Sequence, residues 1–411
     1  MRTRSPLAPI FLIVLVDVLG LTMVIPLLPR YAEEFGASPL VATLLSSCYA
    51  ACSLISSPII GKLSDRHGRR PLLLISQGGT FIGFLILAGA NSLPIIFVGR
   101  ILDGVTAGNL SLAQAYISDH TAPKDRAKSF GIIGIAFGIG FMFGPAISGL
   151  MAKISLGAPF LMAAAMSATS IACTYILLPR EKPPGEPVHP EGSPEGAESK
   201  EPPPPAARKI AVFDWHTYAD YFKRPGFANL LAQFFLFQFA FSCFTQNFAL
   251  FAERRYTHDG IAWGPTEVGY LFAYTGFLGI ILQGGLIGRL VKKFGEAKLI
   301  VAGFLSAAVA YALLSDTYAV TALVGVATIS AFGNGILRPT ITSRITQAVG
   351  RHEQGVALGI SQSLASIAMT IAPPTGGAMI NQRWLGPWAI VCAGVSALGL
   401  IAALASRSAG E

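Results

Sequence analysis

Charged residues are scarce in this sequence, and that scarcity decides the class of protein. Asp, Glu, Lys and Arg make up 13% of the 411 residues, whereas hydrophobic residues make up 52%. A globular protein in water carries about 25% charged residues, so we predict an integral membrane protein. The 30 Lys and Arg exceed the 22 Asp and Glu, which is typical of loops facing an anionic cytoplasmic leaflet. No basic run interleaved with aromatics indicates a nucleic-acid partner.

Cysteine and histidine are few as well, and their placement excludes several kinds of site. None of the five cysteines belongs to a CxxC pair or to a cluster with histidine, which are the patterns of redox and zinc sites. The six histidines all lie in loops or near the ends of apolar runs. No nucleophile paired with a base and no nucleotide-binding loop is recognisable. We therefore expect no enzymatic activity, no metal and no organic cofactor.

Apolar runs long enough to cross a bilayer dominate the chain. A span needs about 20 residues at 1.5 Å each, and twelve runs meet this length: 8–29, 40–61, 71–90, 94–117, 128–151, 157–178, 227–251, 266–288, 298–315, 317–339, 355–380 and 385–405. Arg2 and Arg4 precede the first run as in a signal peptide, but without a small-residue cleavage site we expect this run to be retained. The predicted fold class is all-α, with twelve transmembrane helices.

A stretch of different composition separates the sixth run from the seventh. Residues 180–209 are rich in Pro, Gly and Glu, which predicts a flexible linker. Aromatic and charged residues then alternate up to Lys223, which predicts an amphipathic segment on the membrane surface. We therefore expect an N-terminal six-helix bundle over 1–179, a cytoplasmic linker with this segment over 180–225, and a C-terminal six-helix bundle over 226–411.

The distribution of positive charge predicts the orientation in the membrane. With the N-terminus in the cytoplasm, 23 of the 30 Lys and Arg residues fall on the cytoplasmic side, five fall outside, and Arg100 and Arg338 lie within spans. Short loops rich in Lys and Arg stay in the cytoplasm. We expect both termini to be cytoplasmic, in a multi-pass protein of the cell membrane.

The two halves of the sequence repeat one another. Residues 61–68 recur at 288–295 with an offset of 227, and three positions of the fifth run (131, 145 and 149) recur in the eleventh with an offset of 228. A duplicated six-span unit forms two pseudo-symmetric bundles, with a polar cavity between them near the midplane of the bilayer.

The loop between the second and third runs carries the most specific string, GKLSDRHGRRP at 61–71. A basic membrane anchor would explain its arginines, but not Asp65 or the glycines. The string resembles the signature of the major facilitator superfamily, G-x-L-x-D-R-x-G-R-R/K-P, at every position. The resemblance implies a conformational latch made of Gly61, Asp65, Arg66, Gly68, Arg69, Arg70 and, at the inner end of the fourth run, Asp119. Lys292 stands at the place of Asp65 in the second copy, so we expect a degenerate second latch.

Small residues recur at four-residue spacing in the fifth run. They are Gly134, Gly138, Gly140, Gly144, Pro145 and Gly149. Such spacing lets helix backbones approach closely, and proline bends a helix, so plain packing is one interpretation. The string is also similar to the motif of antiporters in this superfamily, although Ser148 replaces a glycine of that motif.

Charges inside the membrane are expensive and usually functional. Asp17 and Asp103 each lie nine residues inside their runs, about 14 Å deep, so both are predicted near the midplane. Arg100 is one turn from Asp103 and can pair with it, in a structural or a proton-coupling role. Asp17 has no partner on its own helix, and a carboxylate removed from water tends to take up a proton. We expect Asp17, Asp103 and Arg100 to couple protons to transport.

Amides and aromatics within the runs are candidates for substrate contact, because together they suit an amphiphilic organic molecule. The candidates are Asn109, Gln114, Gln233, Gln238, Gln246, Asn247, Tyr270, Tyr274 and Gln362. Hydrogen bonding between helices is the alternative role for each amide.

Within the superfamily, the resemblance is to twelve-span drug/proton antiporters, particularly those of the tetracycline-efflux type. It includes Asp17, Gly20, the IPLLP exit at 25–29 and the AYISD string at 115–119. The resemblance implies an exporter of a small lipophilic or amphiphilic compound that works by alternating access, with protons as coupling ion and no other cofactor. We expect it to act as a monomer in the bilayer. Uptake of a metabolite by proton symport or facilitated diffusion is the alternative, and a non-transporting receptor on the same fold is a third.

Overall fold

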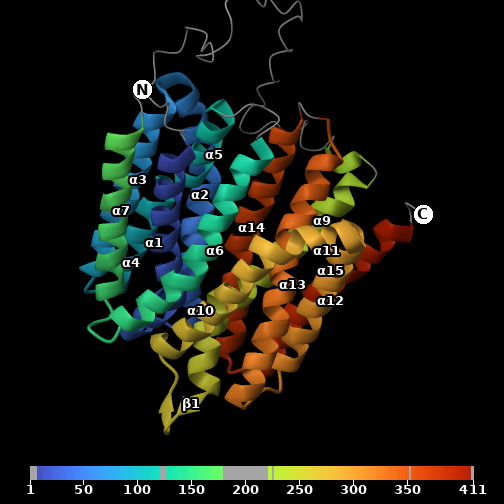
Figure 1. Cartoon of the computed structure of the whole chain (residues 1–411). Helices are drawn as coiled ribbons and strands as arrows, with labels where there is room; N and C mark the ends of the chain where they lie inside the picture. The colour runs from blue at the N-terminus through green and yellow to red at the C-terminus, as the bar shows by residue number, and fades with distance from the viewer. Residues whose placement is uncertain (1–6, 121–125, 179–220, 225, 351–352, 409–411) are drawn as a thin grey trace, which may run out of the picture.

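The structure is a computed structural model that describes residues 7–120, 126–178, 221–224, 226–350 and 353–408. Within these residues, twelve helical spans are long and apolar enough to cross a membrane. Figure 1 shows them as two side-by-side bundles, with α1–α7 in blue and green and α9–α15 in yellow to red. The predicted all-α membrane fold of twelve helices in two bundles is confirmed.

Seven helical segments form the described part of the N-terminal bundle. They are α1 (Leu7–Glu34), α2 (Pro39–His67), α3 (Arg69–Ala88), α4 (Leu93–Val105), α5 (Asn109–His120), α6 (Arg126–Met151) and α7 (Ala158–Leu177).

The C-terminal bundle begins at α9 (Phe227–Arg255), which is followed by a small antiparallel hairpin, β1 (Thr257–His258) and β2 (Ile261–Ala262). The remaining segments are α10 (Pro265–Ile281), η1 (Leu282–Leu286), α11 (Ile287–Phe294), α12 (Glu296–Leu314), α13 (Val320–Gln347), α14 (Gln354–Asn381) and α15 (Leu385–Ser408). The π-helical turn η1 joins α10 to α11, so these three segments form one span.

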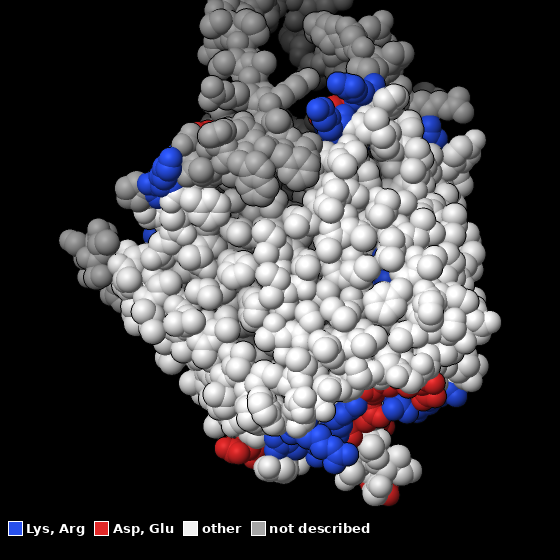
Figure 2. All heavy atoms as spheres, turned by 180° about the vertical axis from the view of Figure 1, so that it is seen from behind, with Lys and Arg blue, Asp and Glu red and all other residues white. Residues whose placement is uncertain are grey.

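Charged side chains mark the two ends of the molecule. On the face in Figure 2, Lys, Arg, Asp and Glu gather at the two ends, and the surface between them is almost entirely uncharged. This is the pattern expected of a protein surrounded by lipid. We call the end that carries β1 and β2 the hairpin end, and the opposite end, which carries residues 61–71, the latch end.

The predicted repeat is visible in the backbone at Gly68 and Gly295. Gly68 ends α2 with φ 91° and ψ 154°, and Gly295 ends α11 with φ 77° and ψ 156°. A side chain is strained at such positive φ values, which is why glycine occupies both corners. The two halves therefore make the same turn at equivalent places.

The fourth span is interrupted, which the sequence did not predict. Its helix stops at Val105 and restarts at Asn109, which frees backbone groups inside the bundle. Serines of neighbouring helices satisfy them: the Ser76 hydroxyl accepts from Gly108 N at 2.9 Å, and the Ser57 hydroxyl donates to the Ala107 carbonyl at 2.8 Å. Broken membrane helices are tolerated where such partners replace the lost bonds.

The predicted linker, residues 180–225, lies outside the described residues except for 221–224. Tyr221 packs against Phe227 with ring centroids 5.7 Å apart. Arg224 donates two hydrogen bonds to Glu353, at 2.8 and 3.0 Å. These contacts tie the entrance of α9 to the start of α14 at the latch end.

Candidate transport site

Asp17 lies inside the N-terminal bundle, on the face of α1 that packs against α3 and α7. Gln77 on α3 and Ser170 on α7 interact with its carboxyl group and are joined to each other by a 2.7 Å hydrogen bond. One turn further along α1, a side chain at Gly20 would meet Phe84 of α3 at 3.4 Å. The carboxyl group therefore points into its own bundle rather than toward the second one.

The Asp17 carboxyl group has no cationic partner among the described residues. Its Oδ1 atom is buried and accepts no hydrogen bond there, and no Lys or Arg of the described chain forms an ion pair with it. The other acid close enough to act on it is Asp103.

Arg100 and Asp103 form the ion pair that their spacing predicts. The guanidinium Nη1 lies 2.8 Å from Asp103 Oδ2, and both side chains are 4% exposed. The guanidinium also lies 4.3 Å from the centroid of the Tyr49 ring on α2. Gly83 on α3 permits the close approach, because a Cβ atom there would lie 3.1 Å from the Cβ of Asp103. The charge of Arg100 is thus already neutralised within the bundle.

The described latch residues contact their own bundle. Arg69 pairs with Asp65 at 2.6 Å and lies beside the Ser64 hydroxyl. Arg70 donates to the Tyr175 carbonyl of α7 at 2.6 Å. Asp65 and Arg66 are exposed, and nothing lies within 4 Å of a Cβ placed at Gly61. The side chain of Asp119 lies outside the part that the structure describes.

The glycines of α6 face two different neighbours. A Cβ atom at Gly140 would lie 2.6 Å from Val18 of α1, and one at Gly149 would lie 2.7 Å from the Pro265 carbonyl of α10. Gly144 meets Thr22 of α1, Gly138 meets Ile280 of α10, and nothing lies within 4 Å at Gly134. The small-residue string therefore joins α6 both to its own bundle and to the other one. At Pro145, the carbonyl lies against Gly269 of α10.

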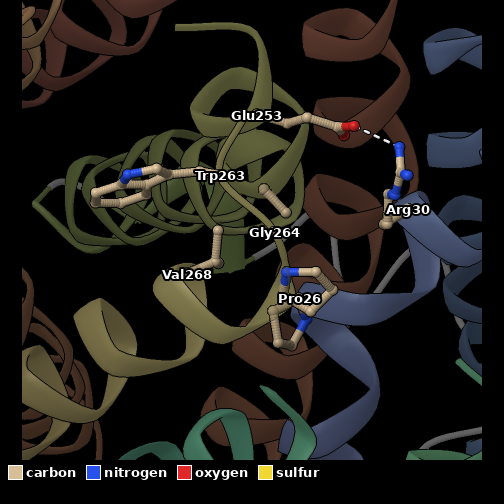
Figure 3. A pocket seen from close by; sticks show the side chains of 8 residues that line it. Pro26, Arg30, Glu253, Trp263, Gly264 and Val268 are labelled. Carbon is tan, nitrogen blue, oxygen red and sulfur yellow. Dashed lines mark hydrogen bonds and ion pairs between the residues drawn. The ribbon is translucent and has the colours of Figure 1, made fainter. Parts of the chain in front are cut away.

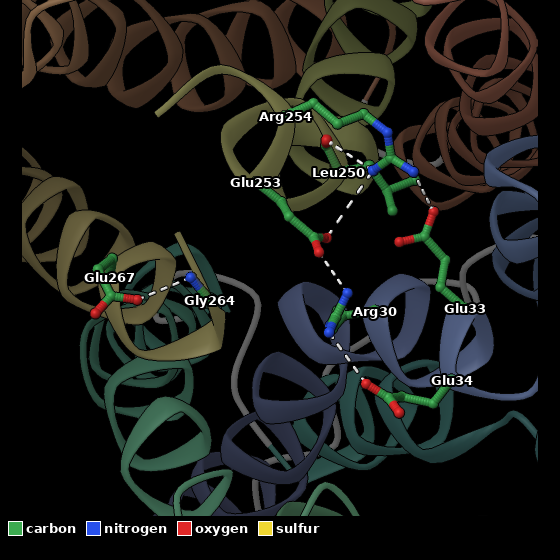
Figure 4. Close-up of polar contacts among 8 residues, drawn as sticks. All are labelled: Arg30, Glu33, Glu34, Leu250, Glu253, Arg254, Gly264 and Glu267. Atoms are coloured by element: carbon green, nitrogen blue, oxygen red, sulfur yellow. Dashed lines mark hydrogen bonds and ion pairs between the residues drawn. The ribbon is translucent and has the colours of Figure 1, made fainter. Parts of the chain in front are cut away.

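Ion pairs join the two bundles at the hairpin end. Arg30 of α1 binds Glu253 of α9, and Arg254 of α9 binds Glu33 of α1 (Figure 4). A small pocket lies beside them, and Figure 3 shows Pro26, Glu253 and Trp263 among its walls. Each of the two helices therefore supplies one arginine and one glutamate, and the two ion pairs hold the bundles together at this end.

Aromatic rings continue along the boundary between the bundles. A second small pocket is lined by Thr22, Pro26, Phe141, Thr245 and Phe272, together with Ile25 and Pro145. Its Phe141 ring lies 6.4 Å from the Phe241 ring of α9. On the latch side, Phe137 stacks on Phe141 at 6.4 Å, and the Arg338 guanidinium of α13 lies 5.2 Å from the Phe137 ring.

Several of the amide candidates are occupied by bonds between helices. Gln246 accepts from Ser46 of α2 at 3.1 Å, Asn247 donates to the Pro373 carbonyl at 3.1 Å, and Gln233 bonds to Asn229 on α9 and to α15. Tyr274 bonds to Thr328 at 2.8 Å, whereas Tyr270 and Gln362 are exposed.

Four of the candidate amides keep an unused oxygen in the described structure: Asn109 Oδ1, Gln233 Oε1, Gln238 Oε1 and Asn247 Oδ1 are buried without a partner. Gln114, on α5, is half-buried. Sequence reasoning missed Thr22, Thr245 and the phenylalanines between the bundles, since threonine and phenylalanine are ordinary in membrane helices. It noted Arg338 as a charge within a span but had no signal for its neighbour Phe137.

Two pseudo-symmetric bundles, joined at one end by ion pairs and with two acids inside the spans of the first bundle, define a membrane transporter. The family model of the Major Facilitator Superfamily matches residues 10–315 and 256–410. The chain belongs to this family.

Curated relatives include drug-resistance proteins of bacteria. The chain is 30% identical to the class C tetracycline resistance protein of Escherichia coli over 91% of this chain and 89% of that one. It is 26% identical to multidrug resistance protein 1 of Bacillus subtilis (strain 168), over 88% and 86% of the two chains.

Solved structures share the fold at low identity. The human organic anion transporter MFSD10 superposes with a TM-score of 0.72 at 19% identity, covering 98% of this chain and 100% of that one. A peptide transporter, POT, in complex with sulfate gives 0.77 at 15% identity, covering 98% and 94%.

Proposed function

We propose that this transporter is a proton-coupled antiporter that exports a small lipophilic or amphiphilic organic compound. The observation that carries the proposal is the Asp17 carboxyl group, which belongs to a half-buried side chain of α1 beside Gln77 of α3 and Ser170 of α7. Its Oδ1 atom is buried, and it has no cationic partner among the described residues. The tetracycline and multidrug resistance relatives support export as the direction.

Protonation of Asp17 would alternate with binding of the substrate. Gln77 and Ser170 can donate hydrogen bonds to the ionised carboxylate, and Asp103 adds a second acid on α4, held by Arg100. α1 carries both Asp17 and Arg30, and Arg30 helps to close the hairpin end. Protonation or deprotonation of Asp17 would therefore act on the same helix. Rigid rocking of the bundles would then expose the site to each side in turn.

The distribution of charge supports a sidedness for this cycle. We place both termini and the latch end in the cytoplasm and the hairpin end outside, following the split of 23 to five Lys and Arg residues. The unit is a monomer of two bundles, 1–179 and 226–411, joined by the linker 180–225. Its partners are the lipid bilayer and the small organic substrate, with no nucleic acid, no metal and no cofactor except protons.

Proton flux in proteoliposomes tests the assignment of Asp17. Asp17→Asn should abolish substrate-driven proton release measured with an internal pH-sensitive dye, because the amide cannot exchange a proton. Asp316→Asn is the matched control, since Asp316 is exposed between α12 and α13, and it should retain full flux. Unchanged coupling in Asp17→Asn would remove this acid from the mechanism. Substrate moving in the same direction as protons would replace antiport with symport.

A further inference from the structure

Arg338 is a cation within a membrane span that lacks an acidic partner in the described chain. It lies on α13, nine residues before the last residue, Gln347, or about 14 Å along the helix axis. Arg100, the other cation within a span, is paired with Asp103. No described carboxylate lies within 4 Å of the Arg338 guanidinium, which is an expensive arrangement for a charge within a span.

The side chain of Arg338 faces the boundary between the bundles rather than lipid. It is exposed, yet its guanidinium lies over the ring of Phe137, which belongs to α6 of the other bundle. In the described structure α13 packs on α9, α10 and α12, and α6 packs on α1 and α10. Arg338 therefore reaches across the space between α13 and α6.

Aromatic rings lead from the guanidinium along the boundary to α9, where two polar atoms are unused. Phe137, Phe141 and Phe241 form a continuous ring-to-ring series from α6 to α9. On α9, Gln238 Oε1 and Thr245 Oγ1, each within about one turn of Phe241, are buried and have no partner among the described residues. Thr245 also lines the small central pocket with Phe141. A ligand here would meet one positive charge, flat apolar surfaces and two neutral polar groups.

We propose that Arg338 binds the acidic group of the substrate, and that the transported compounds are amphiphilic organic monoanions or zwitterions rather than cations. The proposal rests on the proposed function and specifies its substrate class. A planar guanidinium donates two parallel hydrogen bonds to a carboxylate or sulfonate. The phenylalanine series takes the apolar body of the same molecule. A cation would be repelled by Arg338 and would find no free acid on this surface within the described residues.

Three probes that differ only in charge test the proposal: pyrenebutanoate, pyrenebutanol and pyrenebutylamine. Binding to the full-length protein in detergent is measured as the shift of its unfolding temperature with probe concentration. The wild type should bind the acid most tightly. Arg338→Gln should weaken binding of the acid about tenfold or more, the usual range for a hydrogen bond to a charged group. Binding of the alcohol should be unchanged. Arg338→Lys should restore part of the loss.

Two further variants separate charge from folding. Arg344→Gln removes the same charge from the same helix, six residues toward its end, and should bind all three probes as the wild type does. Phe137→Leu keeps the charge of Arg338 but removes the ring, so it should weaken binding of all three probes by a similar factor. The proposal is overturned if the amine or the alcohol binds the wild type as tightly as the acid. Equal losses for all probes in Arg338→Gln, or no binding of any probe, overturn it too.

Proton flux distinguishes this result from failure of the proposed function. If the proposed function holds, pyrenebutanoate drives proton release in wild-type proteoliposomes, and the response is lost in Asp17→Asn. Proton release driven by pyrenebutylamine instead, and retained in Arg338→Gln, would keep antiport and reject the anionic substrate class. Absence of coupled flux despite Arg338-dependent binding of the acid would reject antiport and keep the anion site.

Discussion

At the scale of single residues, the two intramembrane acids of the N-terminal bundle have different environments. Asp103 is held by Arg100 at 2.8 Å, whereas Asp17 interacts with the neutral Gln77 and Ser170. Removing the partner of a buried ion costs more than removing the whole pair, because an uncompensated charge is left in a medium of low dielectric constant. The stability of the protein should therefore depend strongly on the cation beside Asp103 and much less on the carboxyl group of Asp17.

Arg100→Gln should destabilise the protein by about 3–5 kcal/mol, because it leaves the buried Asp103 without its cation. The double variant Arg100→Gln with Asp103→Asn should recover most of this loss. Asp17→Asn, which removes a buried carboxyl group without a cation, should change stability far less. Chemical unfolding in detergent measures all three, and additive losses in the double variant would show that the pair contributes nothing as a unit.

At the latch end, Glu353 offers a test by pH. Hydrogen bonds from Arg224 lower the pKa of Glu353 from 4.5 to about 2, and the Tyr221 hydroxyl adds a third bond. A depressed pKa stabilises the folded state above the unfolded value of 4.5, and the contribution disappears as the pH falls toward 2. The pair is exposed and screened, so its worth is about 1 kcal/mol or less.

Arg224→Gln should therefore lower the unfolding temperature at pH 7, and the difference from wild type should shrink as the pH falls below about 4.5. Taking the difference between the two proteins cancels the other carboxylates that titrate in this range. Lys223→Gln, a neighbouring charge change, serves as the comparison. A difference in unfolding temperature between Arg224→Gln and the wild type that stays constant down to pH 3 would exclude the Arg224–Glu353 bond as its source.

The sequence predicted the Arg100–Asp103 pair but not the surroundings of Asp17. The first depends only on helical spacing, since residues three apart lie on the same face. The second depends on how α1 is rotated about its own axis against α3 and α7, which tertiary packing decides. For the same reason the proximity of Arg338 to Phe137, on another bundle, had no signal in the sequence.

At the scale of elements, α6 and α10 form one of the two extensive helix contacts between the bundles, and α2 and α14 form the other. A Cβ atom at Gly276 would lie 2.6 Å from the backbone nitrogen of Met142, and Gly149 is similarly close to Pro265. Backbone cannot retreat as a flexible side chain can, so these glycines set the distance between the two helices.

Gly276→Ala should push α6 and α10 apart and cost about 1–3 kcal/mol, as overpacking usually does. Gly279→Ala is a matched control on the same helix, because nothing lies within 4 Å of a Cβ there. It should be neutral or slightly stabilising, since alanine favours helix over glycine. Unfolding temperature and transport rate measure both variants, and equal effects would show that the close contact is not limiting.

The apolar runs predicted all twelve spans, yet the ends and the interruption of the helices follow other rules. α1 continues to Glu34 and α9 to Arg255, because polar residues extend a helix beyond the apolar core. The break before Asn109 depends on serines of α2 and α3 that satisfy the freed backbone. Those partners are distant in sequence, so no local pattern indicated the break.

At the scale of the whole molecule, the described ion pairs between the bundles lie at the hairpin end. Arg30–Glu253 and Arg254–Glu33 join α1 to α9 there, whereas the described contacts of the latch residues remain within the N-terminal bundle. In the described structure, the hairpin end is therefore fastened by ion pairs between the bundles.

Glu253→Gln should loosen the hairpin end and shift the population toward the opposite state. Spin labels at Lys153 and Gln382, exposed positions on the two bundles, should report a longer distance in the variant than in an otherwise native protein. The charge swap of Arg30→Glu with Glu253→Arg should restore the shorter distance. Distances that do not respond to either change would mean that the glycine contacts alone hold this end closed.

The ion pairs at the hairpin end reach the surrounding medium. The side chains of Arg30 and Glu253 are 37% and 21% exposed, and those of Arg254 and Glu33 are 29% and 12% exposed. Dissolved ions screen such charges over about 8 Å at physiological ionic strength and over shorter distances in brine. The conformation in which the hairpin end is closed therefore depends on the ionic strength. A high salt concentration on that side of the membrane favours opening of this end.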